Sequence, residues 1–219
     1  MHQKGIDELE EGAYHMDDLK ETGRVEAFSD GVFAVAITLL VLNIQPPSDI
    51  LTESKLLDFL ISKWPNYLAF VTSFFTIGIM WVNHHRLFGH IKRTDTMLLL
   101  LNILLLLAIV FVPFPTALLA GYIVRPDQHL AALVYNGTFV VLAALFNLLW
   151  RYATYRGRLL DTKTDLSAVR AINRQYLFGP VFYGLAFGLA WINVPASVVL
   201  NLLLAVFFAI PSRKLGKLQ

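Results

Sequence analysis

The sequence predicts an all-α integral membrane protein with six transmembrane helices per chain. Two observations on composition support this fold class: 56% of the 219 residues are hydrophobic, and only 16% are charged, where a soluble domain carries about 25%. A third observation is that apolar stretches of about the length needed to cross a bilayer, roughly 20 residues, recur along the chain. We expect spans at residues 24–44, 64–83, 97–120, 129–150, 176–192 and 195–210.

The first predicted helix, residues 24–44, combines membrane length with polar chemistry. A helix of 21 residues is about 31 Å long, close to the thickness of the hydrocarbon layer. Its first turns carry Arg24, Ser29 and Asp30, which need protein or water around them. A stripe on one helix face follows and is the candidate pore wall: Val35, Thr38, Leu39 and Leu42. The alternative is that Thr38 donates to the carbonyl of residue 34 and that the stripe packs like any membrane helix.

Prolines and aromatic residues delimit the next elements. Pro46 and Pro47 end the first helix because they lack N–H donors. Residues 48–63 mix charged and apolar side chains, as in a short amphipathic segment at the membrane interface. Trp64 and Trp81 mark the two ends of the second span as aromatic belts do.

The later spans carry their own boundary signals. Pro113 and Pro115 predict a kink in the third span or its end. The connection between the spans 176–192 and 195–210 is only Asn193 to Pro195, which predicts an antiparallel helical hairpin.

The distribution of basic residues predicts the orientation. Of the 18 Lys and Arg residues, one side of the predicted topology holds only Lys55, Lys63 and Arg125. The positive-inside rule then places both termini in the cytoplasm of a multi-pass protein of the cell inner (plasma) membrane. We expect residues 1–23 to be an acidic, disordered cytoplasmic tail, 24–211 to be the transmembrane domain and 212–219 to be a basic cytoplasmic tail.

Several function classes do not fit this sequence. The net charge of +2 is too small to indicate a nucleic-acid partner, and a chain with 0 Cys has no thiol nucleophile or cysteine metal site. No Walker loop, G-x-G-x-x-G after a strand or nucleophile elbow is found, so we predict no enzyme and no cofactor. The neighbours His84 and His85 diverge by about 100° on a helix, so we predict no metal site there.

Arg24, Phe28, Ser29 and Asp30 form the pattern R-x-x-x-F-S-D. This pattern resembles the first-helix signature of the transmembrane protein 175 family of potassium channels, and residues 84–118 resemble the second conserved block of that family. The resemblance implies a homotetramer in a lipid bilayer whose first helices line a central, leak-type pore for permeating potassium ions. The rival functions are a secondary transporter and a non-conducting oligomeric membrane protein.

The stripe predicts how such a pore would work. The signature occurs once in the chain, so a pore lined by one kind of helix needs several copies. A ring of Val35, Leu39 and Leu42 offers no ligand to an ion, so the ion must be nearly dehydrated and the closed state can be held by dewetting. Potassium holds its water less tightly than sodium, which agrees with a potassium preference.

The polar residues of the signature are expected to anchor the pore helix. Ser29 and Asp30 lie about 240° and 140° around the helix from Val35, so they should face neighbouring helices. The resemblance suggests hydrogen bonds to His84 or His85 and to Asn102. A cation site at the pore mouth, formed by Asp30, is the alternative. The predicted anchoring network comprises Arg24, Phe28, Ser29, Asp30, Trp81, His84, His85 and Asn102.

Overall fold

The structure is a computed structural model that describes residues 22–49, 52–157, 159–161 and 166–210. Nearly all of the predicted tails, at 1–23 and 212–219, therefore lie outside the described residues. The described residues contain no strand, apart from an isolated bridge between Ile91 and Leu160. The helices are α2 (Gly23–Leu39), η1 (Leu40–Asn43), α3 (Glu53–Ser62), α4 (Trp64–His90), α5 (Thr96–Phe111), α6 (Pro113–Tyr122), α7 (Gln128–Thr154), η2 (Tyr155–Gly157), α8 (Leu166–Leu177), α9 (Gly179–Leu189) and α10 (Val194–Ala209).

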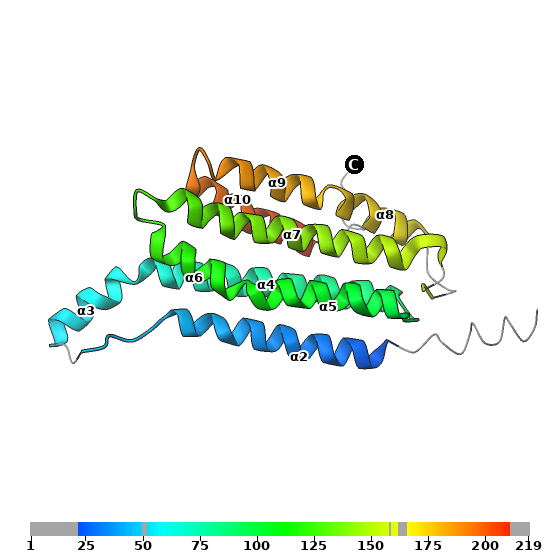
Figure 1. The fold of residues 1–219 in the computed structure, drawn as a ribbon, viewed down its shortest axis with the longest axis horizontal. Coiled ribbons are helices and arrows are strands. Elements are labelled where there is room, and N and C mark those ends of the chain that lie inside the picture. The colour runs from blue at the N-terminus through cyan, green and yellow to red at the C-terminus, as the bar shows by residue number, and fades with distance from the viewer. Residues whose placement is uncertain (1–21, 50–51, 158, 162–165, 211–219) are drawn as a thin grey trace, which may run out of the picture.

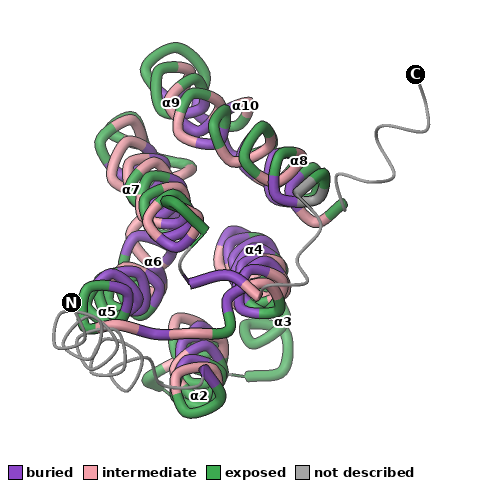
Figure 2. The backbone as a smooth tube through the Cα atoms, turned by 90° about the vertical axis from the view of Figure 1, so that its right-hand side faces the viewer, coloured by how far each residue is buried: buried purple, intermediate pink, exposed green. Residues whose placement is uncertain are grey.

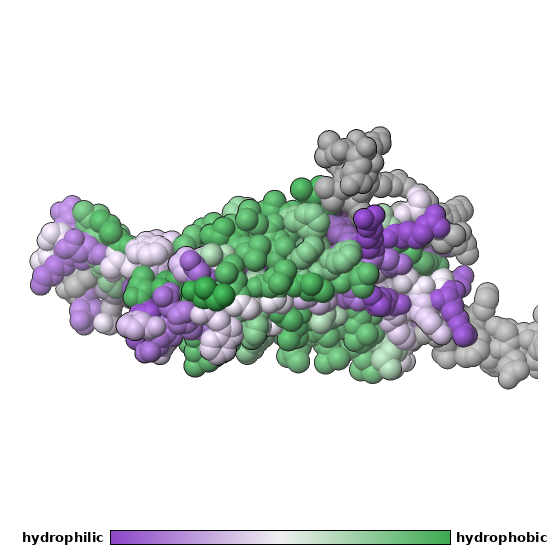
Figure 3. Space-filling view, turned by 90° about the horizontal axis from the view of Figure 1, so that it is seen from above, coloured by the Kyte–Doolittle hydropathy of each residue, from purple (hydrophilic) through white to green (hydrophobic). Residues whose placement is uncertain are grey.

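Four helical stretches are long and apolar enough to cross a membrane. They are Gly23–Asn43, Trp64–His90, Thr96–Tyr122 and Gln128–Gly157. Each begins close to the start of one of the first four predicted spans, but the second and the fourth extend past the predicted ends at residues 83 and 150. The remaining apolar helices, α9 and α10, have 11 and 16 residues and lie alongside the others as a hairpin (Figure 1). On the face shown in Figure 3, apolar side chains cover the middle of the molecule, and polar side chains gather at both ends. This distribution is typical of a protein that sits in a bilayer.

The third span is interrupted at the prolines, where the sequence predicted a kink or an end. α5 ends at Phe111 and α6 begins at Pro113. The N–H of Val112 donates to the carbonyl of Ile109 at 3.1 Å, a tighter turn than the α-helical one. The break forms because Pro113 and Pro115 provide no N–H to continue the helical hydrogen bonds.

The basic segment after α7 differs from the prediction. Instead of a loop up to residue 175, the chain forms α8, and the helix expected to begin at Tyr176 begins at Gly179. Val169, Ile172 and Tyr176 recur at helical spacing and pack on the core, so α8 is amphipathic. Pro180 lies in the first turn of α9, where its missing N–H costs nothing, and this placement explains the break.

Helix α7 packs against α5, α6, α8, α9 and α10. Its Tyr135, Phe139 and Trp150 are among the largest fully buried side chains. Helix α2 lies at one edge of the bundle, away from α9 and α10, and packs mainly against α4 and α5 (Figure 2). Helix α3 has no buried residue and projects from the end of the bundle (Figure 1).

Candidate functional site

Helix α2, together with the 3₁₀ turn η1 that continues it to Asn43, has a buried face and an exposed face. The buried face repeats at helical spacing through Ser29, Phe33, Ala36 and Leu40. Only 22% of the apolar window of this helix is buried, against 39% to 50% in the other three candidate spans. The exposed face follows a regular three-four spacing on the other side of the helix, through Arg24, Phe28, Gly31, Val35, Thr38 and Leu42.

The predicted pore stripe therefore lies outside the bundle of the single chain. Val35 is 54% exposed, Leu42 is 63% exposed and Leu39 is at the margin of the face with 36%. The Thr38 hydroxyl donates to the carbonyl of Val35 at 2.9 Å rather than to that of residue 34. Because a hydroxyl oxygen has two lone pairs, Thr38 can still accept a hydrogen bond or contact a cation from the exposed side.

A buried hydrogen-bonded chain joins α2 to α5 and α4. The amide of Asn102 on α5 donates to the Ser29 hydroxyl at 3.0 Å, and the Asn102 side-chain oxygen lies 2.9 Å from Nε2 of His84 on α4. Ser29 donates in turn to the carbonyl of Val25 at 2.7 Å. His84 also stacks on Phe88, with ring centroids 4.5 Å apart, so its ring plane is fixed. Three helices are thus held in register by groups whose burial makes an unsatisfied partner costly.

A second contact between α2 and α4 lies nearer the surface. The indole N–H of Trp81 donates to a carboxylate oxygen of Asp30 at 2.8 Å. His85 stacks on the Trp81 ring with an interplanar angle of 25°. The two histidines therefore have different neighbours, as their positions one residue apart on a helix require.

Two of the predicted network residues lie elsewhere. Arg24 and Phe28 are on the exposed face of α2, and Phe28 is 62% exposed. Neither shares a hydrogen bond with Ser29, Asp30 or Asn102 in the part of the chain that the structure describes. Both residues extend the exposed face toward the polar start of the helix.

Sequence reasoning missed the anchor at the other end of α2. The amide of Asn43 donates to the carbonyl of Pro113 at the α5–α6 break, at 3.1 Å. The backbone carbonyl of Asn43 accepts from the amide of Asn66 at 3.0 Å. The signal available in the sequence was an asparagine at the end of an apolar helix, but the acceptor is a backbone carbonyl that no side-chain pattern reveals. Helix α2 is therefore tied to its neighbours at both ends.

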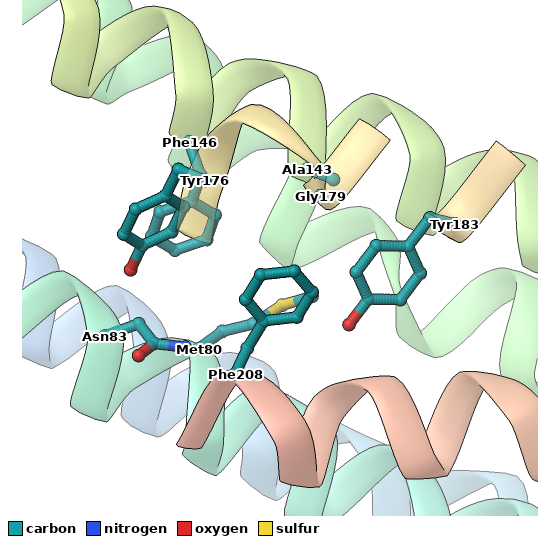
Figure 4. A pocket seen from close by; sticks show the side chains of 8 residues that line it. All are labelled: Met80, Asn83, Ala143, Phe146, Tyr176, Gly179, Tyr183 and Phe208. Carbon is teal, nitrogen blue, oxygen red and sulfur yellow. The ribbon is translucent and has the colours of Figure 1, made fainter. Parts of the chain in front are cut away.

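A small cavity lies within the single chain, between α4, α7, the end of α8, α9 and α10 (Figure 4). Its volume is about 30 Å³, and Met80, Asn83, Tyr176, Tyr183 and Phe208 are among the side chains around it. This volume holds about two water molecules. The cavity is too small to be a pathway for a hydrated ion. Among the described residues, no three His, Asp or Glu side chains come together as metal ligands.

Substitutions at Trp81 and Asp30 can test whether Asp30 anchors helix α2 or forms a cation site. We expect Trp81→Phe to lower the thermal unfolding midpoint in detergent by about 2–4 °C, or roughly 1 kcal/mol, because the donor to Asp30 is lost. Asp30→Asn keeps an acceptor oxygen and should shift the midpoint less. If Asp30→Asn reduces ion currents while Trp81→Phe leaves them unchanged, Asp30 is a cation site instead.

Known proteins resemble this chain over most of its length. The family model described as "Endosomal/lysosomal potassium channel TMEM175" matches residues 24–113. A potassium channel of Chamaesiphon minutus is 52% identical over 193 residues, covering 88% of this chain and 95% of that protein. A potassium channel of Streptomyces collinus is 45% identical over 193 residues, covering 87% of this chain and 92% of that protein.

A solved structure is similar to the fold. It is the crystal structure of a lysosomal potassium-selective channel TMEM175 homolog from Chamaesiphon minutus, with a TM-score of 0.79 and 50% sequence identity. The similarity covers 87% of this chain and 97% of that one. The residues matched by the family model include α2, α4, α5 and all the anchoring contacts described above.

Proposed function

This chain belongs to the TMEM175 family of ion channels, and from this premise we propose that it is a potassium-selective channel of the leak type. The relatives with the highest coverage are named potassium channels, and the proteins it resembles are channels rather than enzymes. The observation that carries the mechanism is the exposed stripe of α2, on the side opposite its contacts with α4 and α5.

We propose that four chains assemble with their α2 helices around a common axis. One helix cannot enclose a water-filled path, whereas symmetric copies of the same face can. The anchors at both ends of α2 support this role, because a pore wall needs a fixed position. The polar end of the stripe, with Arg24 and the nearby Asp30 both exposed, suits a hydrated mouth better than lipid.

The constriction is proposed at Val35, Thr38, Leu39 and Leu42. Three aliphatic rings supply no ligand, so an ion sheds most of its water to pass, and the pore closes by dewetting when it narrows. Thr38 places the only hydroxyl among these four positions, where it can replace part of the lost hydration. Selection then follows the cost of dehydration and favours potassium over sodium.

We further propose six membrane passes with both termini in the cytoplasm. The α9–α10 hairpin supplies the last two passes beside the four longer spans, although each of its helices is short for a bilayer. The α9–α10 turn lies at the end of the bundle opposite the start of α2, as an even number of passes requires (Figure 1). The cell membrane, residues 24–211 as the channel domain and the absence of a cofactor belong to the same proposal.

The test is a planar-bilayer recording of the purified protein in a potassium gradient. We expect unitary current steps and a reversal potential close to the potassium equilibrium potential when sodium replaces potassium on one side. Slow, saturable flux coupled to a second solute would indicate a transporter instead. The absence of any ion flux in liposomes, from protein that elutes as a single species, would indicate a non-conducting protein. Native mass spectrometry of the same sample should give four chains.

A further inference from the structure

An open pocket lies where the end of α7 meets η2 and α8, away from α2 and its anchors. Its volume is about 700 Å³, within the usual range for small-molecule sites. We call it the arginine pocket because three of its lining residues are Arg151, Arg156 and Arg174. The end of α7 and the whole of α8 lie side by side at one end of the bundle (Figure 1).

The charge of the arginine pocket has one sign. None of the described residues that line it is acidic. The Arg156 guanidinium lies over the ring of Tyr155, 5.1 Å from its centroid, and this contact limits where that charge can move. Arg156 also has φ 57° and ψ 13°, a left-handed backbone conformation that non-glycine residues rarely adopt. Guanidinium groups bind phosphate through paired N–H donors, so a lining with three arginines and no acidic residue favours a phosphate group.

The walls of the pocket are held together by hydrogen bonds between α7 and α8. The indole N–H of Trp150 donates to the side-chain oxygen of Asn173 at 2.6 Å. The amide of Asn147 donates to the backbone carbonyl of Tyr176, also at 2.6 Å. Trp150 is 1% exposed, so this wall is part of the core. The shape of the pocket is therefore fixed by the packing of α7 against α8.

Apolar residues continue from the pocket toward the middle of the molecule. Leu148, which is 50% exposed, lies one helical turn from Arg151 on the same face of α7. Leu177 and Phe178 line the pocket itself and are half exposed, and Val181 on α9 is exposed in the next turn. A ligand with a charged head and long apolar chains matches this order of surfaces, whereas a soluble anion would use only the arginines.

We propose that the arginine pocket binds the phosphate headgroup of an anionic phospholipid, whose acyl chains lie along the exposed apolar residues of α7 and α9. This site is separate from the ion path and requires only that the protein lies in a membrane. A lipid bound here would bridge α7 and α8.

Native mass spectrometry of the detergent-purified protein can test this proposal with phosphatidylglycerol and phosphatidylcholine of identical acyl chains. We expect tighter binding of phosphatidylglycerol. Each of Arg151→Gln, Arg156→Gln and Arg174→Gln should weaken it by about fivefold, and the triple variant should bind the two lipids alike. The matched control replaces Lys92, Arg125 and Arg170 with Gln, because these exposed residues lie outside the pocket and the change in net charge is the same.

Two results would overturn the proposal. The first is equal loss of phosphatidylglycerol in the pocket variant and in the control variant, which would mean attraction by net charge alone. The second is displacement of the lipid by millimolar inorganic phosphate, which would mean a site for a soluble anion. If the triple variant does not elute as the native protein does, the single Arg174→Gln variant carries the test against Arg170→Gln, its neighbour on α8. Lipid binding is read without currents, so its outcome is independent of ion conduction.

Discussion

Leu42→Ala is expected to raise the single-channel potassium conductance at least about threefold and to reduce the preference for potassium over sodium. Leu42 is in η1, which continues α2, and is 63% exposed on the face that we place at the pore axis. Removal of its branched side chain from every copy widens the ring and makes it easier for water to fill. A threefold change corresponds to a permeation barrier lowered by about 0.6 kcal/mol. This is a small change for a substitution that shortens the same side chain in all four chains. Single-channel recording in symmetric and bi-ionic solutions measures both quantities.

Leu203→Ala is the matched control for this experiment. Leu203 has a similar exposure, 59%, but belongs to α10, which lies on the opposite side of the bundle from α2 (Figure 2). Its truncation should leave conductance and selectivity unchanged. Unaltered currents in both Leu39→Ala and Leu42→Ala, from tetramers that form normally, would remove this stripe from the pore.

Asn102→Ala is expected to lower the free energy of unfolding by about 1–3 kcal/mol and to disturb conduction. Asn102 is 2% exposed and hydrogen-bonds to both Ser29 and His84. Interhelical hydrogen bonds in membranes contribute about 0.6–1.7 kcal/mol each, and the substitution also leaves a buried histidine without its amide partner. Helix α2 then keeps its packing against α5 but loses the hydrogen bond from Asn102 to Ser29, so the pore wall should become less fixed. Thermal unfolding in detergent and bilayer currents measure the two effects.

Asn136→Ala is the control that distinguishes a general loss of stability from a change in pore geometry. Asn136 is also fully buried and hydrogen-bonds to Ser197 and Asn201, but this cluster joins α7 to α10 and does not touch α2. We expect a similar loss of stability with normal unitary currents. A double-mutant cycle of Ser29→Ala with Asn102→Ala should show coupling, because the two side chains share one hydrogen bond. Additive effects of these two substitutions would contradict the anchoring role.

Much of the fold can be predicted from the sequence because a bilayer imposes length and polarity on each span. The four long helices and the break before Pro113 follow from apolar runs and missing donors. Helix α8 was not predicted, since its apolar residues alternate with arginines in a segment whose charge suffices to explain a cytoplasmic loop. Its amphipathic spacing was visible, but only packing against α7 shows that it is a structural element.

Some contacts of the candidate site could be predicted from the sequence, and others could not. The partners of Ser29 could be narrowed to a few residues because polar side chains are scarce in apolar helices, and Asn102 and His84 were among them. The hydrogen bond from Asn43 to the carbonyl of Pro113 could not be predicted, because every residue has a carbonyl. Only the tertiary structure shows which carbonyl lies within reach of the Asn43 amide.

The sequence by itself determined that this chain is a helical membrane protein and that one helix carries both a polar signature and an apolar stripe. Composition and spacing suffice for this, because each polar group exposed to lipid is unfavourable independently of the tertiary structure. Only the tertiary structure decided which face of α2 is covered by its own chain and which remains exposed. That choice depends on the packing of α4 and α5 against α2, through contacts between residues as far apart as Ser29 and Asn102.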